Sequence, residues 1–89
     1  MLLITKSRKS VVDLNGGAVM ISYETSHQEV SGEFGKFITA VAPCIVFVPF
    51  SKQEKRIFLA YYDTIEEAEE VFNHFINAVK SNKDFFEFY

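Results

Sequence analysis

The spacing of apolar residues changes near residue 63 and divides the chain into two parts. From residue 63 to residue 80 (DTIEEAEEVFNHFINAVK) apolar positions recur at intervals of three and one, which places them on one face of an α-helix. This face consists of Ile65, Ala68, Val71, Phe72, Phe75, Ile76 and Val79. Earlier apolar segments are shorter and bounded by turn residues, which is typical of strands. The pattern therefore predicts several strands followed by one amphipathic helix.

Both ends of the predicted helix carry local signals. Thr64 and Glu67 fit a capping box, and Asp63 with Glu66 offers the same geometry one residue earlier. At the other end, Asn82 tolerates the left-handed conformation in which many helices stop.

Strand-like segments fill most of the chain before the helix. We expect them at residues 2–5, 11–14, 18–24, 36–42, 44–50 and 56–62. Asn15-Gly16 predicts a tight hairpin between the second and third of them. Pro43 interrupts the fourth and fifth, as a turn or as a bulge. The polar residues 25–33 are expected to form a loop, and residues 85–89 (FFEFY) a short final strand that adds to an edge or packs under the helix.

These elements predict a single α+β domain over residues 1–89. The expected fold is an antiparallel sheet of five to six strands, packed by one C-terminal amphipathic helix. Segments 36–42, 44–50 and 56–62 are apolar on both faces, whereas one helix covers only one face. We expect the second face to meet another copy of the chain, which makes a homodimer the favoured assembly. The alternative is a small barrel resembling the pleckstrin-homology-like fold.

Composition limits the class of protein. The chain has 89 residues, 48% of them hydrophobic, which excludes disorder. Its one cysteine, Cys44, excludes an internal disulfide and a cysteine-rich zinc site. The start (MLLITKSRKS) has its charges after a short apolar run, the reverse of a signal peptide, and no segment has the length of a membrane span. We therefore expect a cytoplasmic protein without a membrane partner.

Basic residues gather in two predicted turns. In a simple meander these turns share one end of the sheet, with Lys80 and Lys83 near them and the acidic first turn of the helix at the opposite end. This basic pole could contact an anion or an acidic partner, or could be solvated turns alone. The net charge of −3 and the lack of aromatic residues within KSRKS and SKQEK argue against nucleic acid. The candidate contact residues are Lys6, Arg8, Lys9, Lys52, Lys55 and Arg56.

Sequence patterns of common catalytic sites are missing. The chain has no glycine-rich phosphate loop, GxSxG, HExxH or CxxC. We therefore expect no catalytic residues, no cofactor and no metal. Glu70 and His74 are neighbours on the helix but lack a third ligand, and His74 is expected to be exposed. Cys44 is expected to be a small buried residue, and at most one of Tyr61 and Tyr62 to lie in the core.

Residues 57–72 (IFLAYYDTIEEAEEVF) resemble a pattern in small uncharacterised bacterial and phage-associated proteins. In these proteins an apolar strand ends in tyrosine and leads into a D/S-T/S-x-E-E-A helix start. Residues 11–21 (VVDLNGGAVMI) are similar to the segment that precedes it. The resemblance implies a strand-rich domain with a C-terminal helix and brings no catalytic residues.

These observations favour a non-catalytic protein-binding or assembly module. Its contact surface would be the uncovered sheet face or an edge strand. The alternative is an accessory nucleic-acid-associated protein that uses the basic pole.

Overall fold

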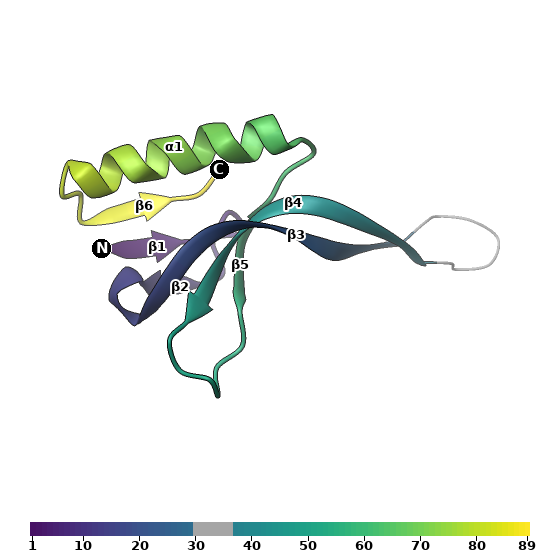
Figure 1. The fold of residues 1–89 in the computed structure, drawn as a ribbon, viewed down its shortest axis with the longest axis horizontal. Coiled ribbons are helices and arrows are strands. Elements are labelled where there is room, and N and C mark those ends of the chain that lie inside the picture. The colour runs from purple at the N-terminus through teal and green to yellow at the C-terminus, as the bar shows by residue number, and fades with distance from the viewer. Residues whose placement is uncertain (30–36) are drawn as a thin grey trace.

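The computed structural model describes the backbone of residues 1–29 and 37–89, and the side chains of residues 1–23 and 41–89. Within these ranges it shows an α+β domain, as predicted, in which a single α-helix follows five strands (Figure 1). The elements in chain order are β1 (Leu2–Ile4), β2 (Val11–Asp13), the 3-10 turn η1 (Leu14–Gly16), β3 (Gly17–Glu29), β4 (Phe37–Pro49), β5 (Ile57–Tyr61), α1 (Ile65–Lys80) and β6 (Phe85–Glu87).

The strands form two sheets, so the prediction of one sheet of five to six strands is wrong. One sheet has the order β2-β1-β6 and the other the order β3-β4-β5. Backbone N–H of Lys6 donates to the carbonyl of Leu59 at 2.8 Å and joins the two sheets at one corner. The described strands therefore do not form the continuous barrel that was the alternative, nor a simple meander.

Strand register divides the β3-β4-β5 sheet into two faces. Val19, Phe47 and Ile57 are partners on the inner face, where they pack against the core. Met20, Val46 and Phe58 are partners on the outer face, which lies outside this core cluster. Because paired residues share a side of the sheet, this alternation assigns each residue to one face.

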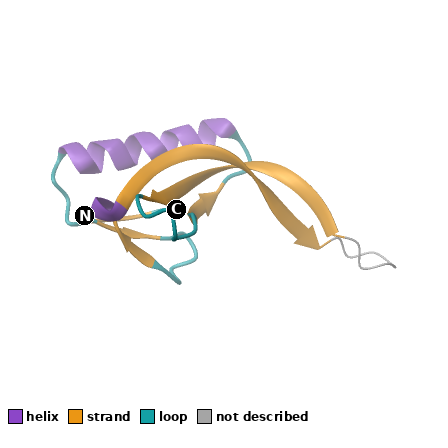
Figure 2. Ribbon diagram, turned by 60° about the horizontal axis from the view of Figure 1, so that its bottom comes forward, coloured by secondary structure: helices purple, strands orange, loops and turns teal. Residues whose placement is uncertain are grey.

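The core lies between the inner face, the other sheet and the helix, which runs along the curved β3–β4 pair (Figure 2). Its buried members come from all three layers: Leu3, Ile45, Phe47, Leu59, Ala60, Tyr62, Ala68, Val71, Phe75 and Phe88. The second sheet therefore helps the helix to cover the inner face, while part of the outer face stays open.

The helix prediction is confirmed in detail. Thr64 is the N-cap, and its Oγ1 accepts a hydrogen bond from Glu67 N–H at 3.2 Å. Asn82 has φ 53°, and Lys83 N–H donates to the carbonyl of Ala78 at 3.1 Å. This is the Schellman arrangement, in which a left-handed residue lets the chain satisfy the last carbonyls of a helix.

The C-terminal strand adds to an edge, as predicted. β6 pairs with β1 in parallel, with Leu3 opposite Phe86. The main chain continues this contact, since Phe88 N–H donates to the carbonyl of Ile4 at 3.0 Å. Phe86 and Phe88 pack edge to face at 4.9 Å, and both contact the Phe75 ring of the helix. The aromatic end of the chain is therefore part of the core.

β4 is one long strand rather than two. Pro43 lies inside it, opposite Tyr23 of β3, so it is neither a turn nor the bulge, which falls between Ile45 and Val46. The Pro43 carbonyl accepts from Tyr62 N–H at 2.9 Å. Because N and O of a strand residue point to the same side, the missing N–H faces β5 and interrupts no bond to β3.

β3 is also longer than predicted. It extends to Glu29, so residues 25–29 of the expected loop are strand, paired with residues 37–41 of β4. The rest of that expected loop, and the start of the expected fourth strand at Lys36, lie outside the described residues.

The hairpin predicted at Asn15-Gly16 does not form. These residues belong to η1, where Asp13 Oδ1 accepts from Asn15 N–H at 2.9 Å, and the chain then passes from one sheet to the other. Gly17 begins β3 so close to β4 that a Cβ atom would collide with the carbonyl of Val48 and lie 2.6 Å from the Phe47 ring. Glycine at this position permits the close approach.

Candidate binding surfaces

The first basic segment is a turn of defined shape. Buried Thr5 anchors it, since Thr5 N–H donates to the Ser10 carbonyl at 3.1 Å and Arg8 N–H donates to the Thr5 carbonyl at 2.8 Å. Arg8 takes the left-handed conformation, with φ 62°. The bond from Lys6 N–H to the Leu59 carbonyl then fixes this turn beside β5. We call residues 6–10 the basic loop.

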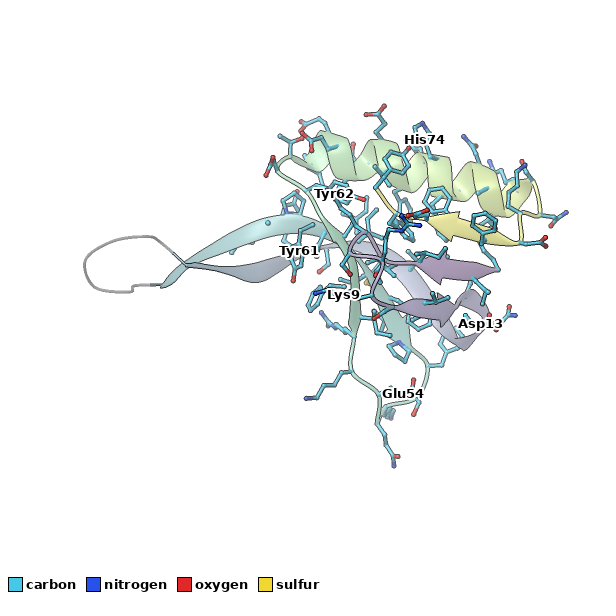
Figure 3. All side chains as sticks on the ribbon, turned by 180° about the vertical axis from the view of Figure 1, so that it is seen from behind. Lys9, Asp13, Glu54, Tyr61, Tyr62 and His74 are labelled. Atoms are coloured by element: carbon cyan, nitrogen blue, oxygen red, sulfur yellow. The ribbon has the colours of Figure 1, made fainter. Side chains whose placement is uncertain are left out.

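A groove of about 520 Å³ lies between the basic loop and β5. The rings of Phe58 and Tyr61 stack there, with centroids 5.3 Å apart and planes at 26°. Phe58 is 42% exposed although it is a large apolar residue. The hydrogen bond from Lys6 N–H to the Leu59 carbonyl places the basic loop against this part of β5, the strand on which Figure 3 labels Tyr61. The groove is lined by Lys6, Ser7, Phe58, Leu59, Ala60 and Tyr61.

All six candidate contact residues are exposed, but the structure groups them differently from a single pole. Lys6, Arg8 and Lys9 lie in the basic loop, and Lys52, Lys55 and Arg56 lie in the turn that leads into β5. Arg8 Nε pairs with Glu87 Oε1 of β6 at 3.0 Å.

The expected separation of basic and acidic ends is not found at Lys6. A second hollow of about 260 Å³ brings Lys6 together with Glu67 and Glu70 of the first helical turns. The meander assumption fails because β1 and β2 form their own sheet with β6, and the loop after β1 then meets the start of the helix instead of its end.

Tyr62 is the buried polar residue of the second hollow. Its side chain is 6% exposed, and Lys6 Nζ lies 5.4 Å from its ring centroid, within reach of a cation–π interaction. Within the described residues its hydroxyl is the one buried side-chain polar atom without a hydrogen-bond partner. Burial, and then the neighbouring Tyr89, raise the pKa of Tyr62 to about 12. This hydroxyl is therefore a neutral group at ordinary pH.

Other candidate residues have structural roles. Cys44 is fully buried, as predicted, and its thiol donates to the Ser22 carbonyl at 3.4 Å. His74 is exposed, as predicted, and its Nδ1 is hydrogen-bonded to the Tyr89 hydroxyl. Across the side chains that the structure describes, no three metal-ligating residues come together.

A third feature is the long antiparallel pair of β3 and β4. Pairing of β4 with β5 begins only at Cys44, so β4 before this residue is paired along its length with β3 alone among the described strands. This part extends away from the helix and the other sheet in Figure 1. We call residues 23–29 and 37–43 the ribbon. At its base Tyr23 is 61% exposed and Val41 is 68% exposed.

Two arrangements could not be found by sequence reasoning. The aromatic rings missing from the basic segments themselves are supplied by Phe58 and Tyr61 of β5. Tyr62 meets Tyr89 and Lys6 only after the chain folds. Alternation within residues 56–62 indicated only that at most one of Tyr61 and Tyr62 lies in the core, and the structure confirms this, since Tyr62 belongs to the core cluster and Tyr61 does not.

Comparison with known proteins finds no match: no family model, no curated protein and no solved structure is similar to the chain. The resemblance to small bacterial and phage-associated proteins thus remains a prediction. Within the part of the chain described, no helix has the length and apolar character needed to span a membrane.

Proposed function

We propose that this protein is a non-catalytic binding or assembly module that forms a homodimer through the ribbon. The observation that carries the proposal is the extension of β3 and β4 beyond β5, with Tyr23 and Val41 exposed at its base. The single reduced cysteine, Cys44, accords with a cytoplasmic setting.

The ribbon is expected to bind another chain because an isolated two-stranded ribbon is unstable in water. Such a pair is marginal unless a third strand or another layer packs on it. An edge that meets no third strand also offers N–H and C=O groups that readily pair with a strand of another chain, and the described ribbon beyond Pro43 has no such strand beside it. Burying an exposed side chain such as Tyr23 or Val41 adds about 1.5–3 kcal/mol for each residue that leaves water.

A second copy of the chain fits these needs. It brings an identical ribbon with the same free edges, and antiparallel pairing of identical strands satisfies both partners around a twofold axis. The contact would then combine backbone hydrogen bonds with apolar contacts of Tyr23 and Val41.

Sedimentation velocity over a wide range of concentration tests the proposal. We expect the wild-type protein to sediment as a dimer, and Tyr23→Glu and Val41→Glu to sediment as monomers. Phe50→Glu is the matched control, because Phe50 is 73% exposed but lies just beyond the opposite end of β4. A wild-type monomer at every concentration, or a dimer that survives both ribbon substitutions, would overturn the proposal.

Accessory nucleic-acid association is the second candidate function. It gains support from one specific observation, the aromatic pair Phe58–Tyr61 beside the basic loop. Proteins that bind single strands combine positive charge with stacking rings, and the two basic segments by themselves lack such rings.

A further inference from the structure

The groove between the basic loop and β5 combines two aromatic rings with a basic side chain, Lys6. Phe58 and Tyr61 stack in it, and Phe58 lies directly opposite Val46, which is fully buried on the same outer face. One face of the Phe58 ring stacks on Tyr61, while the residue stays 42% exposed. A fixed and exposed aromatic ring can stack on a planar ligand with little loss of side-chain entropy.

The two basic segments that flank β5 differ in charge from the chain as a whole. The basic loop and the turn at 51–56 together carry six cationic side chains and one carboxylate, Glu54, although the net charge of the chain is −3. Arg8 pairs with Glu87, and Lys6 borders both this groove and the hollow that contains Glu67 and Glu70, whereas Lys9 of the basic loop is exposed. A partner that approaches β5 from this side therefore meets the cations of the basic loop next to an aromatic surface, with Glu87 paired to one of these cations.

We propose that this groove binds single-stranded nucleic acid, with a base stacked on Phe58 and Tyr61 and the phosphate backbone along the basic loop. The inference rests on the second candidate function and assigns it a site. A single strand is the occupant that matches both features, because its bases are free to stack and its backbone is anionic. In a duplex the bases stack on one another, so their faces are not open to Phe58 and Tyr61.

Fluorescence anisotropy with labelled oligo-dT and oligo-U, titrated with the full-length protein at low and moderate salt, tests this site. We expect Phe58→Ala and Tyr61→Ala each to weaken binding by about fivefold to a hundredfold. Tyr61→Phe should retain binding, because the ring is kept. Lys9→Gln should lower the slope of log affinity against log salt by about 0.7, the value for one phosphate contact on a single strand.

Two matched controls separate the groove from general effects. Phe85→Ala removes a ring that is 60% exposed on β6, and Lys80→Gln removes a charge at the end of the helix. Neither should change affinity by more than about twofold. Circular dichroism and the thermal midpoint show whether each variant is folded. Tyr61→Ala and Phe58→Ala are independent tests, so if one of the two variants does not fold, the other still tests the site.

The outcomes distinguish the site from the function. Loss of binding in the ring variants but not in the controls supports the groove. If Phe58→Ala and Tyr61→Ala leave the affinity unchanged but Lys52→Gln and Lys55→Gln lower it, the groove is not the binding site, although the second candidate function is still supported. Equal affinity for a duplex and a single strand overturns the stacking site. So does displacement of the oligonucleotide by polyglutamate to the same extent in the wild type and in the ring variants. No binding at about 50 mM salt overturns both, since phosphate contacts are strongest at low salt.

Discussion

Tyr62 connects the core of the protein to its surface chemistry. The ring belongs to the core cluster, but the hydroxyl is buried without a hydrogen-bond partner among the described residues. A buried polar group of this kind costs about 1–3 kcal/mol when it leaves water unpaired. The residue therefore reduces stability through one atom while it adds stability through its ring.

We predict that Tyr62→Phe stabilises the protein. The change keeps the ring and removes the unpaired hydroxyl, so the free energy of unfolding should rise by about 1 kcal/mol. Urea denaturation measures the free energy of unfolding. Tyr23→Phe is the control, because Tyr23 is exposed and removing its hydroxyl should leave stability nearly unchanged. A clear loss of stability in Tyr62→Phe would mean that the hydroxyl is hydrogen-bonded in solution.

Alkaline pH should destabilise the protein through the same group. Folding raises the pKa of Tyr62 from 10.0 to about 12, so between these values the unfolded chain loses the proton and the folded chain keeps it. The contribution of the Tyr62 ionisation equilibrium to the free energy of unfolding is therefore complete below pH 10. It is lost as pH rises to 12, which lowers the free energy of unfolding by up to about 3 kcal/mol. The difference in unfolding free energy between the wild type and Tyr62→Phe, followed from pH 9 to pH 12, isolates this effect. A difference that stays constant over this range contradicts the prediction.

Gly17 gives a third prediction at the residue scale. Gly17→Ala should cost about 1–3 kcal/mol, because the new methyl group meets the Val48 carbonyl and the Phe47 ring. Gly16→Ala is the matched control, since the nearest atom would lie 3.8 Å from its Cβ. Thermal or urea unfolding of the two variants should therefore differ, and equal stabilities would count against the close approach of β3 and β4.

At the scale of elements, the helix is the best-predicted part of the chain. Its start, its end and its buried face depend on residues within one contiguous segment. Strand lengths follow less well from the sequence, because a proline such as Pro43 indicates an interruption of the strand. Whether proline can lie inside a strand depends on the strand next to it, and that neighbour is distant in sequence.

The helix cap can be tested directly. Thr64→Ala removes the acceptor for Glu67 N–H and should lower the unfolding free energy by about 1 kcal/mol. Thr64→Ser keeps a hydroxyl at the same position and should remain close to wild type. If the two substitutions have equal effects on chemical denaturation, the hydroxyl bond is not what stabilises the start of the helix.

At the scale of the whole molecule, the two ends of the chain close the fold. β6 pairs with β1, so the last residues complete a sheet begun by the first. Leu3 and Phe88 are nearly or fully buried in the resulting core. The stability of the domain therefore depends on contacts between residues more than eighty positions apart.

Phe88→Ala should accordingly destabilise the whole domain by about 3–5 kcal/mol, the usual cost of removing a buried phenylalanine ring. Phe85→Ala, three residues away and 60% exposed, should cost less than about 1 kcal/mol. Chemical denaturation of both variants measures the contrast. Similar values for the two would mean that the C-terminal strand does not pack in the core in solution.

Sequence alone determined the α+β class, the helix with its caps, the burial of Cys44 and the strand-like character of the last residues. Each of these depends on neighbours along the chain: the spacing of apolar residues, a Thr64–Glu67 pair, an apolar context. Tertiary structure decided which strands pair, since the division into two sheets and the parallel contact of β1 with β6 depend on contacts between distant segments. It alone brought the basic loop to Phe58 and Tyr61, because Lys6 and Leu59 become neighbours only when the two sheets meet.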